Sequence, residues 1–238
     1  MKSAVIKNWD NKTWLSSNHY IKSFNRFLLK IIKLNSKSKI LDIGCGRGKI
    51  LGNLSSLLNL KKKPIGIDLV NHKDKDRRIL FKKKDAMSFF SDNKKKFDLI
   101  LIKQTIHLLN HYNIKKLIND CKKNLNQDGA ILVFTLDPYK NRIPSFKLMR
   151  KKLNKSLQRD KMISKSLFKY NFNKISKKFI YKVKISKKRY LRMINDRFIS
   201  TLLSMTKKEI SNGVQEIDAK FNKILRFNDN LVCIILRK

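Results

Sequence analysis

The chain has 238 residues, which suits one α/β domain with a substantial core and excludes two sizeable domains. With 57 Lys and Arg against 17 Asp and Glu, its formal charge of +40 makes polyanions such as nucleic acid or an anionic membrane surface partners to consider. The basic residues are spread along the whole chain among many Asn and Ile, so a coding bias toward A/T-rich codons explains the same charge.

The cysteines and the apolar runs restrict the cellular context. Cys45, Cys121 and Cys233 show no C-x-x-C spacing, so the sequence indicates neither a disulfide framework nor a zinc site, and no metal is expected. Residues 1–7 contain no apolar stretch of signal-peptide length, and no run reaches the roughly 20 apolar residues of a membrane span. We therefore expect a cytoplasmic protein.

The first half of the chain alternates helical and strand patterns. Apolar residues at helical spacing predict a helix over residues 20–33, ahead of the strand Ile-Leu-Asp-Ile at 40–43 and a second helix over 50–58. Further apolar runs predict strands at residues 64–68, 78–81, 97–102 and 130–136 and a helix over 114–125. Strand runs without alternation, separated by helices, are typical of a parallel sheet covered on both faces. The sequence predicts a doubly wound α/β domain.

The pattern loosens after Pro144. Residues 145–157 predict a helix, residues 179–185 alternate like a strand, and residues 187–221 predict two or three helices that Gly213 interrupts weakly. The apolar run at 231–236 predicts a buried closing strand. The second half therefore combines two more strands with a helical insertion between them.

The segment after the first strand contains three alternating glycines, Gly44, Gly46 and Gly48, and leads into a helix. Glycines here let backbone N–H groups approach a ligand at a helix N-terminus. The dinucleotide fingerprint G-x-G-x-x-G is not met, because Lys49 stands at its third glycine position. Asp42 would repel a pyrophosphate and attract the sulfonium and ammonium groups of S-adenosylmethionine.

This hydrophobic-acidic-hydrophobic-Gly-x-Gly-x-Gly pattern resembles the first motif of the class I S-adenosylmethionine-dependent methyltransferases of small-molecule type, and the resemblance covers residues 20–136. It implies a Rossmann-like, mostly parallel seven-stranded sheet whose last two strands form an edge hairpin. It also implies an N-terminal helical segment (1–36), a cofactor-binding core (37–144) and an acceptor region with the final strands (145–238). Residues 186–225 would be a helical lid.

The resemblance also implies a cofactor site. Asp68 lies about 20 residues after the glycines, where a doubly wound fold places an acid that binds ribose hydroxyls. By resemblance, Asp85 and Ala86 would meet the adenine. Alternatively, Asp68 caps the next helix and Asp85 is a solvated acid. The expected cofactor-binding residues are Asp42, Gly44, Cys45, Gly46, Gly48, Asp68, Leu69, Asp85, Ala86, Lys103 and Gln104.

The segment 97–109 resembles the family's fourth-strand motif, whose final residues lie between cofactor and acceptor. His107 is therefore the candidate catalytic residue, able to take a proton from the acceptor; a packed histidine at the start of an apolar helix is the alternative. Trp9, Trp14 and Tyr20 are candidates for closing over the acceptor, with core packing as the alternative.

The leading hypothesis is methyl transfer from S-adenosylmethionine to a small-molecule acceptor by in-line displacement, and the basic composition favours an anionic acceptor. One alternative is an RNA methyltransferase. Lys-Gln-Thr-Ile at 103–106 replaces the N/D/S-P-P-Y/F/W motif of amino-group nucleic-acid methylases, and Asp-Pro-Tyr at 137–139 follows a different strand. A second alternative is a non-catalytic module that binds S-adenosylmethionine or RNA.

Overall fold

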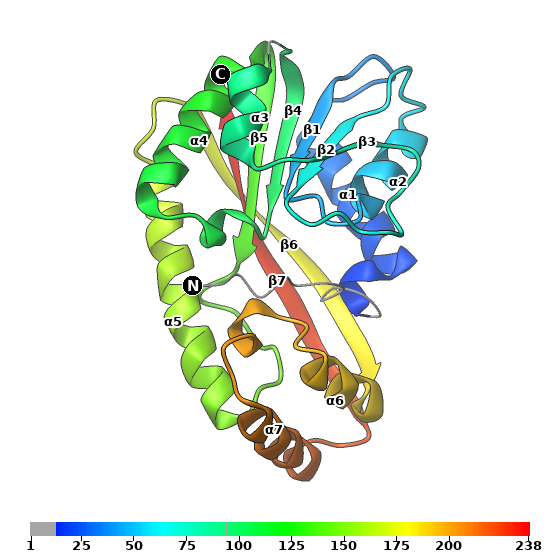
Figure 1. Cartoon of the computed structure of the whole chain (residues 1–238), viewed down its shortest axis with the longest axis vertical. Coiled ribbons are helices and arrows are strands. Elements are labelled where there is room, and N and C mark those ends of the chain that lie inside the picture. The colour runs from blue at the N-terminus through cyan, green and yellow to red at the C-terminus, as the bar shows by residue number, and fades with distance from the viewer. Residues whose placement is uncertain (1–12, 94) are drawn as a thin grey trace.

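The computed structural model describes residues 13–93 and 95–238, so the candidate Trp9 lies outside the described residues. Its seven-stranded sheet has the order β3-β2-β1-β4-β5-β7-β6, with helices packed along it (Figure 1). The strands are β1 (Ile40–Ile43), β2 (Ile65–Asp68), β3 (Leu80–Lys83), β4 (Phe97–Lys103), β5 (Leu125–Leu136), β6 (Asn173–Ser186) and β7 (Ile224–Arg237). The α-helices are α1 (Asn18–Ile31), α2 (Lys49–Leu57), α3 (Ala86–Asp92), α4 (His111–Lys123), α5 (Lys147–Leu167), α6 (Lys187–Asn195) and α7 (Lys207–Lys220).

The sheet is mostly parallel, as predicted. β1 pairs in parallel with β2 and β4, and β3 and β5 extend the parallel part on either side. β7 is antiparallel to both β5 and β6, so β6 and β7 form the hairpin expected at the sheet edge. The predicted doubly wound α/β fold is confirmed.

Alternating residues of the central strands supply a core on each face of the sheet. Leu99 and Leu101 of β4 belong to the cluster that α1 and α2 cover with Phe24, Leu28 and Leu54. Ile100 and Ile102 of the same strand belong to the opposite cluster, which α4 covers with Leu117. The apolar run 99–102 of β4 is thus buried on both faces of the sheet, which is typical of parallel sheets.

The β6–β7 hairpin continues past the parallel strands and carries a second lobe. Figure 1 shows α6 and α7 gathered at its far end, beside the first half of α5. The helix α7 begins with a capping box, in which the Thr206 hydroxyl accepts from the Glu209 N–H and the Glu209 carboxylate accepts from the Thr206 N–H. This lobe corresponds to the insertion predicted between the last two strands.

Several predicted boundaries were wrong. The helix α3 was missed, and β3 lies at residues 80–83 rather than 78–81 because lysines fill the exposed face of this edge strand. The helix α5 continues to Leu167, ten residues beyond its predicted end at 157. Within the described ranges, no helix has both the length and the apolar character needed to cross a bilayer.

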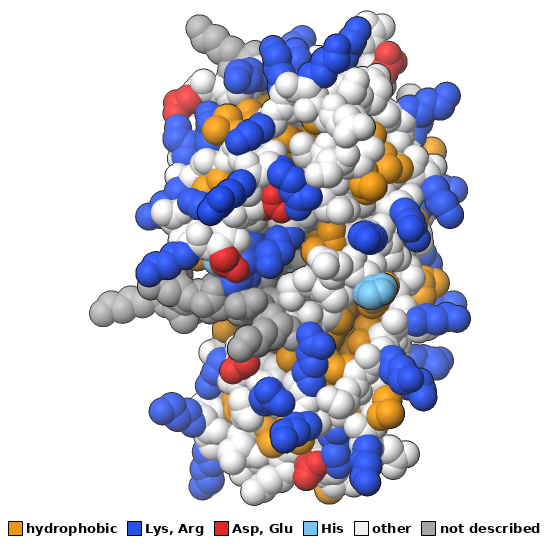
Figure 2. Space-filling view, turned by 90° about the vertical axis from the view of Figure 1, so that its right-hand side faces the viewer, with side chains coloured by type: hydrophobic (Ala, Val, Ile, Leu, Met, Phe, Trp, Pro, Cys, Tyr) orange, Lys and Arg blue, Asp and Glu red, His pale blue; other side chains and the backbone are white. Residues whose placement is uncertain are grey.

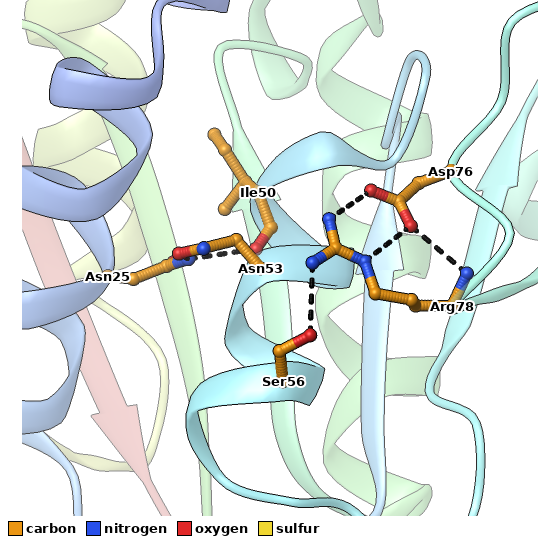
Figure 3. A network of polar contacts seen from close by, with 6 residues as sticks. All are labelled: Asn25, Ile50, Asn53, Ser56, Asp76 and Arg78. Atoms are coloured by element: carbon orange, nitrogen blue, oxygen red, sulfur yellow. Dashed lines mark hydrogen bonds and ion pairs between the residues drawn. The ribbon is translucent and has the colours of Figure 1, made fainter.

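Polar contacts hold α2 from two sides (Figure 3). On one side, the fully buried Asn25 of α1 donates through Nδ2 to the Ile50 carbonyl at 2.9 Å and to Asn53 Oδ1 at 2.8 Å. On the other side, Arg78 donates to Ser56 Oγ at 3.0 Å and forms an ion pair with Asp76 at 2.6 Å. These contacts fix the helix whose N-terminus completes the glycine turn.

Gly213 is a point of close approach rather than an interruption of α7. A Cβ on Gly213 would lie 2.5 Å from a ring carbon of the buried Phe146. We predict that Gly213→Ala lowers the free energy of unfolding by about 1–2 kcal/mol through overpacking, despite a helix-propensity gain of about 1 kcal/mol.

Asn212→Ala is the matched control, because Asn212 is exposed on the same helix and its replacement brings only the propensity gain. Urea denaturation of both variants measures the difference. If Gly213→Ala were as stable as Asn212→Ala, the contact with Phe146 would not restrict this position.

Candidate functional site

The glycine turn lies between the ends of β2 and β4. Gly44, Gly46 and Gly48 have φ of 74°, 54° and 70°, a left-handed region in which a side chain is strained. The N–H groups of Gly44 and Cys45 both donate to the Ile67 carbonyl, at 2.9 and 3.0 Å. A Cβ on Gly44 would lie 2.1 Å from Thr105 Oγ1, so only glycine fits this close approach. The turn therefore occupies the switch point where doubly wound sheets bind ligands.

Asp68, at the end of β2, binds the glycine turn through a backbone hydrogen bond. Its Oδ2 accepts from the Gly46 N–H at 2.8 Å and its Oδ1 accepts from the Val70 N–H at 2.9 Å. Leu69, the next residue, is 68% exposed. Asp68 thus contacts the turn directly, and its expected role toward ribose hydroxyls stays a prediction.

A cavity of about 90 Å³ opens at the turn, and we call it the glycine-turn cavity. It brings together predicted residues from the ends of β1 and β4, namely Asp42, Gly44, Cys45, Gly46, Lys103 and Gln104. Its other lining residues are Leu15, Ser16, Ile21, Arg47, Lys49 and Ile50. The predicted residues Gly48, Asp68, Leu69, Asp85 and Ala86 are not among those that line it in the described part of the chain.

The ionisable side chains in the described lining of this cavity include the acid Asp42 and the bases Arg47, Lys49 and Lys103. Asp42 is 4% exposed, and burial raises the pKa of its carboxyl to about 7, while Lys103 opposes that shift and Asp68 adds to it. The Lys103 ammonium donates to Gln104 Oε1 at 3.0 Å and lies 5.4 Å from the ring centre of Tyr20. Gln104 has φ of 51°, a strained conformation of the kind that clusters at ligand sites.

Asp85 caps α3. Its Oδ1 accepts from the N–H groups of Met87 and Ser88, at 2.9 and 3.0 Å, and its Oδ2 accepts from the Ser88 hydroxyl. The Ser88 hydrogen bonds hold the pKa of this carboxyl below its usual range. Asp85 and Ala86 therefore start a helix at the end of β3, and their contact with adenine stays a prediction.

A second cavity of about 90 Å³ shares Leu15 and Gln104 with the first, and we call it the Trp14 chamber. Of the residues expected at the acceptor, Trp14 and His107 line it. The remaining lining residues come from helices and loops of both lobes and from β5 and β7: Leu108, Leu136, Ile143, Ser156, Asp160, Arg197, Phe198, Ile199, Ser200, Thr201, Leu203 and Asp229. The two cavities therefore adjoin each other at Leu15 and Gln104.

His107 lies on the short 3₁₀ helix η2 (Ile106–Leu108). Burial, with a smaller contribution from Arg159, lowers the pKa of its imidazole to about 4. The imidazole is consequently neutral at physiological pH, so it can accept a hydrogen bond or a proton but is a weak base.

Trp14 and Tyr20 differ in their surroundings. Trp14, on the 3₁₀ helix η1 (Trp14–Ser16), donates through Nε1 to Asp229 Oδ2 at 3.0 Å and lines the chamber. Tyr20 is fully buried and packs edge-on against Phe179 at 5.6 Å, and it is not among the residues lining either cavity. The packing alternative describes Tyr20, whereas Trp14 lies at the chamber itself.

Sequence reasoning missed the carboxylates of the chamber. Asp160 is 2% exposed on α5 and Asp229 is 1% exposed on β7. The predicted helix ended before Asp160 and the predicted strand began after Asp229. The sequence did contain a signal for Asp160. Continuing the helical spacing to residue 163 places Asp160 on the same face as Leu153, Leu157 and Ile163, and this face is buried.

Comparisons with known proteins agree with this geometry. A family model described as a methyltransferase domain matches residues 16–175, more than half of the chain. Among solved structures, the plantazolicin methyltransferase BpumL, in complex with a monoazolic desmethylPZN analog and SAH, is 16% identical, with a TM-score of 0.54 over 97% of this chain and 87% of that chain. No curated protein sequence matches.

Two further structures share the fold. A protein described as a methyltransferase from an antibiotic biosynthesis pathway of Anabaena variabilis is 15% identical, with a TM-score of 0.64 over 90% of this chain and 96% of that chain. A SAM-dependent methyltransferase from Archaeoglobus fulgidus is 19% identical, with a TM-score of 0.53 over 92% and 94%. With the matched family model, the strand order and the glycine turn, the chain belongs to the class I S-adenosylmethionine-dependent methyltransferases.

Proposed function

We propose that this enzyme transfers a methyl group from S-adenosylmethionine to a small-molecule acceptor held in the Trp14 chamber, by in-line displacement. The observation that supports the proposal is the pair of adjoining cavities, which share Leu15 and Gln104. One cavity is built on the glycine turn and the other is mostly apolar. In this assignment residues 37–144 bind the cofactor, and residues 145–238 supply much of the acceptor site.

The residues at the glycine turn fit the cofactor. The three glycines leave the backbone open to close approach, and the Asp42 carboxylate suits a cationic ligand. When bound, S-adenosylmethionine supplies an electrophilic methyl group whose leaving group is a neutral thioether. The Lys103 ammonium also interacts with Asp42, so the Asp42 carboxylate would offset the charge of Lys103 in addition to that of the bound cofactor.

The remaining work is positioning and exclusion of water. Leu15 and Gln104 lie where donor and acceptor would meet, so they define the line of transfer. The apolar chamber walls, including Leu136 and Phe198, keep water from the acceptor. The neutral His107 imidazole accepts a hydrogen bond or a proton from the acceptor, which orients the attacking atom.

A basic groove favours nucleic-acid methylation as a second candidate. This groove, of about 1050 Å³, is lined by Arg142, Lys147, Arg150, Lys182, Lys184, Lys220 and Arg226, with Glu216 as its acidic residue. On the face shown in Figure 2, however, Lys and Arg side chains are scattered over the whole surface. Scattered charge supports non-specific attraction to polyanions more than a defined nucleic-acid site.

We predict that Asp68→Ala weakens the affinity for S-adenosylmethionine by about 1–3 kcal/mol, because a charged acceptor that also holds the Gly46 N–H is lost. Isothermal calorimetry measures the change. Asp92→Ala is the control, since Asp92 is an exposed carboxylate paired with Lys84. Undiminished affinity in Asp68→Ala would remove this residue from the cofactor site.

We predict that His107→Ala leaves the affinity for S-adenosylmethionine intact and lowers acceptor-dependent release of S-adenosylhomocysteine about 10²-fold. Pools of small-molecule acceptors provide the assay. His107 is neutral above its pKa of about 4, so turnover should show no inflection from His107 near pH 6.5. His111→Ala, at an exposed position on α4, is the control. Unchanged turnover in His107→Ala would assign His107 to packing.

The nucleic-acid candidate predicts that binding of a single-stranded RNA oligonucleotide weakens with salt, with a log-log slope of about −0.7 per phosphate neutralised. Lys182→Ala, in the groove, should make the slope shallower, whereas Lys177→Ala, exposed on the same strand outside the groove, should not. Fluorescence anisotropy at several salt concentrations measures both. A slope near zero removes this candidate.

A further inference from the structure

The Trp14 chamber contains a carboxylate with a buried oxygen that no described residue hydrogen-bonds. Asp160 projects from α5, is 2% exposed, and lines the chamber. Its Oδ1 is buried and has no hydrogen-bond partner among residues 13–93 and 95–238. A buried carboxylate oxygen without a donor is destabilising, and either protonation of the carboxyl or a ligand that donates to the oxygen relieves this cost.

The arginines near this chamber are engaged elsewhere. Arg159 donates to the Leu109 carbonyl at 2.6 Å. Arg197 donates to the carbonyls of Leu202 and Met205, each at 2.5 Å, and so braces the loop before α7. Neither guanidinium group donates to Asp160 Oδ1, although the charge of Arg159 acts on this carboxyl. A donor for Oδ1 therefore has to come from outside the described residues.

The other walls also suit a cation. Asp229 adds a second buried carboxylate, whose Oδ2 accepts from Trp14 Nε1. The rings of Trp14 and Phe198 lie 5.3 Å apart, both line the chamber, and aromatic rings attract cations through their π faces. An anionic group in this chamber would face two carboxylates.

We propose that the acceptor of this enzyme carries a protonated amine, which the Asp160 carboxylate binds inside the Trp14 chamber. This inference rests on the proposed function, since it names the class of molecule that the chamber takes. It replaces the anionic acceptor expected from composition, because that expectation came from surface lysines and not from the residues that line the chamber.

The experiment uses three small probes of matched size: n-butylammonium, n-butanol and butyrate. Ligand-observed NMR with the full chain, near pH 8 and with and without S-adenosylhomocysteine, ranks their affinities. We expect n-butylammonium to bind at least about tenfold more tightly than n-butanol, because a charged hydrogen bond is added, and we expect butyrate to be excluded. Equal affinities for the three probes would overturn the proposal.

Asp160→Asn tests the residue. The amide keeps the shape and removes a buried charge, so the variant should fold with a Tm at least as high as that of the parent chain. We expect it to lose the preference for n-butylammonium while keeping the parent affinity for S-adenosylhomocysteine. Asp218→Asn removes the same charge from a carboxylate that is 57% exposed and should change neither. A preference retained in Asp160→Asn would overturn the proposal.

The pH dependence of the parent chain gives a test that needs no variant. Burial raises the pKa of Asp160 to about 7, with Arg159 opposing, so n-butylammonium affinity should fall as pH drops through this value. The other ionisable groups in the described lining of the chamber are Asp229, His107 and Arg197, and Lys103 and Tyr20 act on Asp229. His107 stays neutral down to about pH 4, so it does not titrate in this range. The pKa of Asp229 is also raised by burial, so Asp229 can leave a residual slope in Asp160→Asn, but the slope should flatten because the contribution of Asp160 is lost. A slope that persists unchanged in Asp160→Asn would overturn the assignment.

The two proposals fail separately. If the parent chain does not bind S-adenosylhomocysteine, the proposed methyl transfer is wrong, whatever the probes show. If it binds S-adenosylhomocysteine and shows no preference for the ammonium probe, the chemistry of the acceptor is wrong and the cofactor assignment stands.

Discussion

The close approach of Gly44 to Thr105 sets the geometry of this site. A side chain at Gly44 would overlap the Thr105 hydroxyl, so the turn after β1 can lie against the end of β4 only because residue 44 has no Cβ. The Ile67 carbonyl accepts from Gly44 and Cys45 and fixes the turn from the β2 side. With both strand ends tied to one turn, Lys103 and Gln104 are held beside Asp42, and the glycine-turn cavity and the Trp14 chamber share a wall.

Three buried carboxylates in the lining of the two cavities contrast with the basic surface. The formal net charge is +40, and lysines and arginines are scattered over the face seen in Figure 2. Inside, Asp42, Asp160 and Asp229 are all less than one-tenth exposed, and burial raises the pKa of each. Salt screens exposed charges beyond about 10 Å, whereas groups in low dielectric are screened much less. We therefore expect the choice of ligand to follow the buried carboxylates more closely than the composition.

Local patterns were enough to predict the glycine turn and part of the lining of the cavity beside it. The strand, the glycines and the helix after them follow one another directly, and parallel strands bring Asp42, Lys103 and Gln104 to one edge of the sheet. The chamber depends instead on residues far apart in sequence, Trp14, Asp160, Phe198 and Asp229, which meet only through tertiary packing. The length of β6 was missed for a similar reason, since its exposed lysines give no apolar signal and its pairing with β7 defines it. Asp85 differs from these residues. Its capping contacts are with residues two and three positions along the chain, yet its capping role was not predicted.

Separate carboxylates on the two sides of the shared wall solve an electrostatic problem that the proposed reaction poses. A cationic donor and a protonated acceptor in adjoining cavities repel each other, and this repulsion is strong in a low dielectric. In the proposed complex Asp42 would lie at the first charge and Asp160 at the second, so each cationic ligand would bind beside a carboxylate. After transfer the sulfur is neutral, so Asp42 attracts the spent cofactor less than the donor. The attraction between Asp160 and the amine would not change on transfer, so the spent cofactor could leave while the acceptor site keeps its affinity for amines.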